Sequence, residues 1–167
     1  MAKSITTGVG GNSDATLRAS LTKLQSAACD FLMSTGGLAI KTAGSALAKA
    51  ATLCKAWVNG VLVSIAANTD MTALSGTVTN AKFNVYVFSV DSAGTLYTQM
   101  GTEGATLGAV VFPTIGSDRA VIGFVIINPT GTGNFVGGTT ALDDATVVPN
   151  AVYVNTPYPW NPNALSL

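Results

Sequence analysis

The feature that most constrains the fold is an apolar stretch with a turn in its middle, "KFNVYVFSVDSAGTLYTQ" (residues 82–99). Val, Tyr and Phe favour strands, and the D-S-A-G segment at residues 91–94 favours a turn, so we predict a β-hairpin. Side chains alternate across a strand, which places on opposite faces the two sets Phe83, Val85, Val87 and Tyr86, Phe88, Val90. Both sets are apolar, so we expect this strand to be covered on both sides.

Further strand signals follow the same pattern along the chain. "WVNGVLVSI" (residues 57–65) contains Asn59-Gly60, the strongest short hairpin turn. "RAVIGFVIINP" (residues 119–129) predicts another strand, which Pro129 ends, and shorter edge strands are expected within residues 134–147 and 151–156. Five or more strands with Gly-rich turns and little helix predict a mainly β fold, either a β-sandwich or a compact β-barrel.

Residues 38–56 fit two structures. Leu47, Ala50, Cys54 and Trp57 are spaced as on one face of a helix. The same segment could form two strands around a turn at Gly44-Ser45. Periodicity does not decide between these alternatives.

The N-terminal segment carries an amphipathic helix signal. Residues 1–13 are rich in Gly, Ser and Thr and predict a flexible arm, and Asp14 is a suitable N-cap. An apolar stripe follows at spacings of four and three residues and ends before Gly36-Gly37; its members are Leu17, Leu21, Leu24, Ala28 and Phe31. The stripe packs either on its own domain or on another subunit.

The C-terminal segment places large aromatic rings on a backbone that proline restricts. Tyr158 and Trp160 lie among Pro157, Pro159 and Pro162, which favour an extended, solvated conformation. We therefore divide the chain into an arm with a short helix (1–37), a β domain (38–156) and an extended tail (157–167).

Charge is sparse and unevenly distributed. Charged residues make up 10% of the chain, against roughly 25% in an average soluble protein. Residues 1–56 hold six basic and two acidic residues, whereas residues 57–167 hold two basic and six acidic ones. Gly, Pro and charges interrupt every apolar run, so we predict neither a membrane span nor a signal peptide. Low charge and zero net charge favour association with other protein.

Candidate chemistry is weak throughout. The chain has no His, which removes the commonest general base and metal ligand. The acidic residues, among them Asp143 and Asp144, lie in turn-like contexts and are predicted to be solvated, while Asp118-Arg119 predicts a charge pair at a strand start. Cys29 and Cys54 match no zinc or redox motif and are expected to be buried free thiols. The basic residues are scattered and lack interleaved aromatics, so nucleic-acid binding is not expected. We predict no catalytic residue, cofactor or metal.

The order of these motifs resembles a module of tailed-bacteriophage virion proteins, found in capsid decoration (cement) proteins, head fibres and tail-associated proteins. The resemblance covers residues 46–156 and rests on the Asn59-Gly60 hairpin, the residue 82–99 hairpin, and Pro113 before the strand at residues 119–127. A Phe-x-x-G-x-T-x-L segment (residues 135–142) completes it. In such modules residues 38–57 form strands, so the resemblance favours strands there.

The resemblance implies a non-enzymatic virion protein, made in the host cytoplasm and located on the capsid surface. It would form a homo-oligomer, expected to be a trimer, and would bind the major capsid protein to stabilise the shell. The expected partner-binding residues are Leu17, Leu21, Leu24, Phe31, Tyr158 and Trp160. The alternative is a head or tail fibre or spike component that binds a host receptor. A carbohydrate-binding module or small hydrolase would need an exposed aromatic platform, for which the candidates are Trp57, Tyr86 and Tyr97.

Overall fold

A computed structural model describes residues 16–18 and 30–156. It contains twelve strands and one short 3₁₀ helix, η1 (Leu107–Ala109), and residues 16–18 form a helical turn. Every strand pairing is antiparallel. The predicted mainly β fold is confirmed.

The larger sheet has the strand order β12-β10-β8-β9. Its strands are β8 (Asn84–Asp91), β9 (Leu96–Met100), β10 (Arg119–Ile127) and β12 (Val152–Asn155). The predicted hairpin at residues 82–99 is therefore β8–β9. Its turn is held by Asp91, whose side chain accepts the backbone N–H groups of Ala93 and Thr95.

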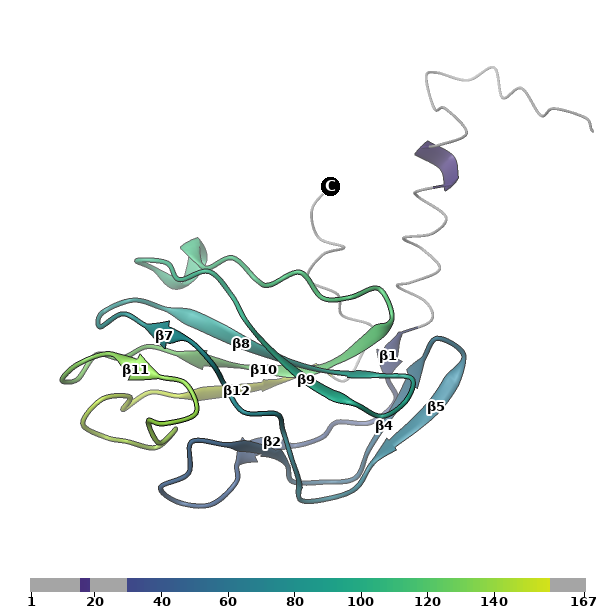
Figure 1. The fold of residues 1–167 in the computed structure, drawn as a ribbon, viewed down its shortest axis with the longest axis horizontal. Coiled ribbons are helices and arrows are strands. Elements are labelled where there is room, and N and C mark those ends of the chain that lie inside the picture. Colours follow the sequence, from purple (N-terminus) through teal and green to yellow (C-terminus); the bar gives the residue numbers. More distant parts are fainter. Residues whose placement is uncertain (1–15, 19–29, 157–167) are drawn as a thin grey trace, which may run out of the picture.

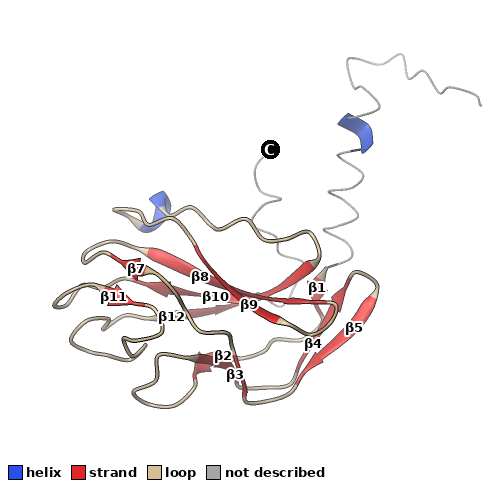
Figure 2. Cartoon of the chain, in the orientation of Figure 1, coloured by secondary structure: helices blue, strands red, loops and turns tan. Residues whose placement is uncertain are grey.

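A second layer faces this sheet (Figure 1). It consists of one sheet ordered β1-β4-β5, with β1 (Phe31–Leu32), β4 (Cys54–Val58) and β5 (Val61–Ile65). Beside it lies a sheet ordered β2-β3-β6, with β2 (Leu38–Ile40), β3 (Ala48–Ala50) and β6 (Thr69–Asp70). The small pair β11 (Phe135–Val136) and β7 (Thr77–Val78) lies at the end opposite β5 (Figure 2).

The main core fills the space between the two layers. Tyr86, Phe88 and Val90 enter it from β8, and Cys54, Ala56 and Val58 enter it from β4. Sheets that face each other must bury one apolar side each, and these inward residues supply it. The two-layer arrangement is a β-sandwich.

The outer face of the larger sheet is also covered. Val85 and Val87 of β8 and Val121 of β10 form a second apolar cluster with Ile115. Phe112 packs edge-on against Phe124 of β10, with 5.1 Å between the ring centroids. The segment between β9 and β10 therefore lies over this face, above β8 in Figure 1. The prediction that the strand within residues 82–90 is covered on both sides is confirmed.

Residues 38–57 and Phe31, the last residue of the predicted helical stripe, form strands in the structure. Residues 38–57 form strands β2, β3 and most of β4, with a turn at Gly44, as the resemblance favoured. Phe31, the last member of the predicted helical stripe, lies instead in β1 and pairs with Trp57, so the helix prediction is wrong at that position. Phe31 forms a strand because an edge of β4 lies beside it and supplies backbone hydrogen-bond partners. Leu21, Leu24, Ala28 and the residue 157–167 tail lie outside the described residues.

Candidate interaction surface

An apolar row crosses the outer face of the β1-β4-β5 sheet. Phe31 pairs with Trp57, and Trp57 pairs with Leu62, so the three side chains share one face of neighbouring strands. Their chain neighbours Leu32, Ala56 and Val63 point the other way, into the core. Trp57 is 37% exposed and Leu62 50% exposed. We call Phe31, Trp57 and Leu62 the outer row.

The residues flanking the outer row along the chain are also exposed and apolar. Met33, Leu53 and Val61 are each roughly half exposed. With Trp57 and Leu62 they make up five of the ten exposed large hydrophobic residues in the described part of the chain. Val61 pairs with the inward-facing Val58, so it lies at the turn end of the inner face. The exposed apolar residues therefore gather at this sheet, although not all on one face of it, instead of being scattered singly.

The local sequence explains why these residues face outward. Asn59 and Gly60 both have positive φ, at 48° and 81°, as a two-residue type I′ hairpin requires. This turn fixes the register Val58–Val61 and Trp57–Leu62. Asp30 supports the same end of the sheet by accepting the Asn59 N–H at 2.7 Å. Burial of this carboxyl, offset in part by that hydrogen bond, raises the pKa of Asp30.

The predicted partner-binding residues are divided between described and undescribed parts of the chain. Phe31 lies in the outer row, and Leu17 lies in the helical turn at residues 16–18 with 48% exposure. Leu21, Leu24, Tyr158 and Trp160 lie outside the described residues. Their role in binding stays a prediction.

Sequence reasoning named Trp57 only as a candidate for an exposed glycan platform, and it did not identify Leu62 as a surface residue. The signal was present, because Lys55 lies two positions before Trp57 and a lysine marks the solvent face of a strand. The two-residue turn then places Leu62 opposite Trp57. The proposed glycan platform of Trp57, Tyr86 and Tyr97 is wrong, because Tyr86 is fully buried in the core.

The acidic side chains that accept hydrogen bonds hold turns and loops. Asp144 accepts the N–H groups of Thr146 and Val147, and Glu103 accepts the N–H and hydroxyl of Thr79. Backbone hydrogen bonds lower the pKa of Asp91 and Glu103, chiefly those from Thr95 and Thr79 respectively. Within residues 16–18 and 30–156, no group of three or more metal-ligating side chains gathers.

Arg119 begins β10, as the strand-start prediction required. Its Nε lies 3.8 Å from the Asp118 carboxylate, and its guanidinium lies 3.5 Å from the centroid of the Tyr97 ring. The Tyr97 hydroxyl in turn donates to Asp91. This chain of contacts links the β8–β9 turn to the start of β10 and has a structural role.

Cys54 is fully buried on the inner face of β4 and forms no disulfide. Its Sγ donates to the Ser34 carbonyl at 3.2 Å. Burial raises the pKa of the thiol to about 11, so it is neutral and unreactive at neutral pH. The prediction of a buried free thiol is confirmed for Cys54, and Cys29 lies outside the described residues.

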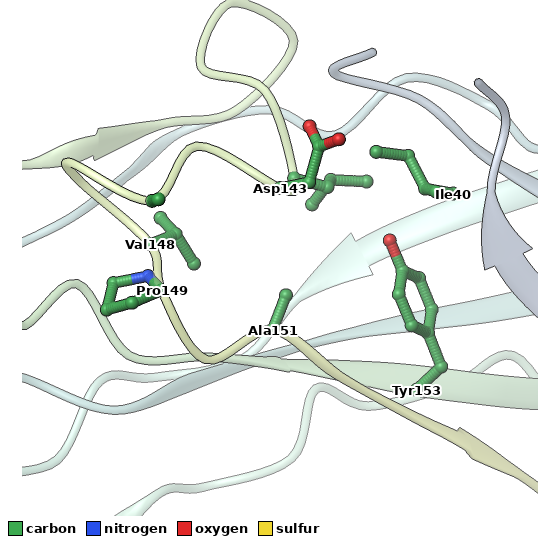
Figure 3. Close-up of a pocket in the computed structure, with 8 residues that line it drawn as sticks. Ile40, Asp143, Val148, Pro149, Ala151 and Tyr153 are labelled. Carbon is green, nitrogen blue, oxygen red and sulfur yellow. The ribbon is translucent and has the colours of Figure 1, made fainter. Parts of the chain in front are cut away.

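A pocket of about 270 Å³ lies beside β2 and β12 (Figure 3). Its walls are mainly apolar and come from Ile40, Leu142, Ala145, Val148, Pro149 and Ala151. Two polar side chains, Asp143 and Tyr153, also line it. Sequence reasoning favoured a solvated turn residue at Asp143 and did not predict this pocket.

None of the helices in the described part of the chain is long and apolar enough to cross a membrane. Comparison of the chain with protein-family models, with curated proteins and with solved structures found no match.

Proposed function

We propose that this chain is a non-enzymatic virion structural protein, a capsid decoration (cement) protein that self-associates and binds the major capsid protein. The observation that supports it best is the outer row, an apolar strip on the outside of a sandwich whose core is already packed. The resemblance of residues 46–156 to phage virion modules is the reason for proposing a phage capsid as the larger assembly. This proposal places the protein on the capsid surface after synthesis in the host cytoplasm.

The outer row serves self-association in this proposal. Trp and other large rings contribute most of the binding energy at protein interfaces, and Trp57 lies at the centre of the row. The sheet ends in two edge strands, β1 and β5, which lack a further partner in the described chain. An apolar face bounded by free edges is a surface that natural proteins cover.

The two terminal segments bind the capsid shell in this proposal. Leu17, Leu21 and Leu24 from one end and Tyr158 and Trp160 from the other would contact several capsid subunits. An oligomer, here a homotrimer, carries several copies of each segment, so modest contacts add up to tight binding. A protein that binds the assembled shell and not free subunits stabilises the shell by mass action.

A receptor-binding fibre component is the second candidate. Fibre tips present exposed aromatic residues on loops, whereas Trp57, on strand β4, is the exposed aromatic residue of the described part of the chain. The decoration role is therefore preferred.

The test mixes purified chain with expanded empty capsids that lack it, taken from the particle whose genome encodes it. We expect saturable binding with a fixed number of copies per shell and a higher temperature of shell disruption. A variant lacking residues 157–167 should bind more weakly and still self-associate. Absence of capsid binding, together with adherence to host cells, would support the fibre role instead.

A further inference from the structure

The pocket between β2 and β12 contains a polar group without a partner. The hydroxyl oxygen of Tyr153 is buried and forms no hydrogen bond with any described residue. In Figure 3 the ring of Tyr153 stands across the pocket from Val148 and Pro149, with its hydroxyl end toward Ile40. Leaving a buried hydroxyl unpaired costs about 1–3 kcal/mol, but less than 1 Å² of this oxygen is exposed, so an occupant of the pocket can pair with it only if the Tyr153 side chain shifts.

Asp143 gives the same pocket a negative charge. Both of its carboxylate oxygens lie 3.0 Å from the Gly44 nitrogen, so they share one N–H donor and keep capacity for more. The nearest lysine to Gly44 along the chain, Lys41, is paired with Asp70. No described Lys or Arg forms an ion pair with Asp143.

The occupant must therefore combine three properties. It must be small enough for about 270 Å³, it must offer an apolar stem to walls such as Ile40, Val148 and Pro149, and it must end in a positively charged donor. A lysine side chain has all three, since four methylene groups carry a compact ammonium with three N–H donors. A sugar ring would bring hydroxyl groups and no charge.

We propose that this pocket binds a lysine side chain of a protein partner. The aliphatic stem lies along the apolar walls and the ammonium donates to the exposed Asp143 carboxylate. A shift of the Tyr153 side chain on binding lets its hydroxyl oxygen accept from the same ammonium. Burial, with the nearby Asp143 charge, raises the pKa of Tyr153 to about 12, so its hydroxyl is intact at neutral pH. This inference does not depend on the proposed decoration role.

The experiment titrates the full chain with Nα-acetyl-lysine N-methylamide and follows backbone amide signals by NMR. The comparison compound is the norleucine analogue, which keeps the stem and lacks the ammonium. We expect saturable shifts at Gly44, Ala151 and Tyr153 with the lysine compound. The norleucine analogue should bind more weakly by up to about fivefold, the upper end for a solvent-exposed ion pair.

Variants separate the pocket from general charge effects. Asp143→Asn keeps an acceptor for Gly44 and should weaken lysine binding about fivefold, and Tyr153→Phe should weaken it by a smaller factor. Asp144→Asn removes the same charge one residue away from the pocket lining and should leave binding unchanged. Because the two compounds are also compared on the unaltered chain, a variant that fails to fold does not decide the result.

Any of the following outcomes would overturn the proposal. One is the absence of saturable shifts at these amides, which would mean that the pocket holds solvent. Another is equal binding of the lysine and norleucine compounds, or equal loss in Asp143→Asn and Asp144→Asn. The third is tighter binding of a monosaccharide than of the lysine compound, which would assign the pocket to glycans.

Discussion

The two principal sheets of the sandwich differ in how far their outer faces are covered by other residues of the described chain. The β12-β10-β8-β9 sheet is covered outside by the segment between β9 and β10, where Ile115 and Phe112 pack on it. The β1-β4-β5 sheet has no such cover in the described chain, and Trp57 and Leu62 of its outer row stay exposed. Both outer faces carry large apolar side chains, yet only those of the larger sheet are buried by the described residues of its own fold.

This difference separates residues that stabilise the fold from residues available for association. Side chains on both faces of β8 lose contact with water when the chain folds, so changes there reduce stability. Side chains of the outer row keep much of their exposure, so changes there should act mainly on assembly. The predictions below test that separation.

The largest expected effect is the loss of a core ring from β8. Phe88→Ala should reduce the free energy of unfolding by about 3–5 kcal/mol, because it leaves a cavity at a fully buried site. Trp57→Ala removes a ring of similar kind from the exposed face and should cost about 1 kcal/mol. Urea unfolding followed by circular dichroism measures both. Equal losses would contradict the distinction between the two faces.

The next effect concerns the bulge that shapes β10. The register of β10 against β8 shifts between Val121 and Gly123, and Gly123 has φ of +154°. An added Cβ would lie 2.3 Å from the Val154 carbonyl oxygen of β12. Gly123→Ala should cost about 1–3 kcal/mol and increase hydrogen exchange at β12 amides. The control is Gly108→Ala, where nothing lies within 4 Å, and which should be nearly neutral.

Two buried titratable groups in the main core, Cys54 of β4 and Tyr86 of β8, predict that the free energy of unfolding depends on pH. Burial raises the pKa of Cys54 from 9.0 to about 11 and that of Tyr86 from 10.0 to about 12. Between the unfolded and folded pKa values of each group, the unfolded chain releases a proton that the folded chain keeps. The free energy of unfolding is therefore at its full value below pH 9 and falls as pH rises. Between about pH 8 and 10 the loss should be about 1.5–2 kcal/mol, measured by urea unfolding under reducing conditions. Cys54→Ala should flatten most of this slope, and an unchanged slope would contradict the assignment.

The smallest expected effect on stability belongs to the outer row. Leu62→Lys places a charge on the solvent face of β5 and should change the free energy of unfolding by no more than about 0.5 kcal/mol. Urea unfolding at a concentration where the protein is dissociated isolates this term. A loss comparable to that of Phe88→Ala would mean that Leu62 is part of the core.

Local signals in the sequence were sufficient for the two hairpins β4–β5 and β8–β9 and for strand β10. Asn59-Gly60 determined one hairpin, and the alternation of apolar residues from Phe83 to Val90 assigned both faces of β8. These features depend on neighbours in the chain. The helical spacing at residues 47–57 left the choice between helix and strands open, because a period near 3.6 also arises by chance in a short, Ala-rich segment.

The remaining features depend on contacts between distant residues. Phe31 joins a sheet because β4, more than twenty positions later, provides its partner. The pocket combines Ile40 with Tyr153, and the Gly44 N–H reaches Asp143 across 99 positions. No local pattern predicts such long-range contacts, because they depend on how all the strands pair and how the two layers pack.

The central claim is that the outer row is buried between copies of this chain. Sedimentation velocity of the full-length protein and of Leu62→Lys, over a series of concentrations, tests it most directly. We expect the unaltered protein to sediment as an oligomer that dissociates on dilution, and Leu62→Lys to sediment as a monomer throughout. A monomeric unaltered protein at the highest concentration, or identical association of the two proteins, would contradict the claim.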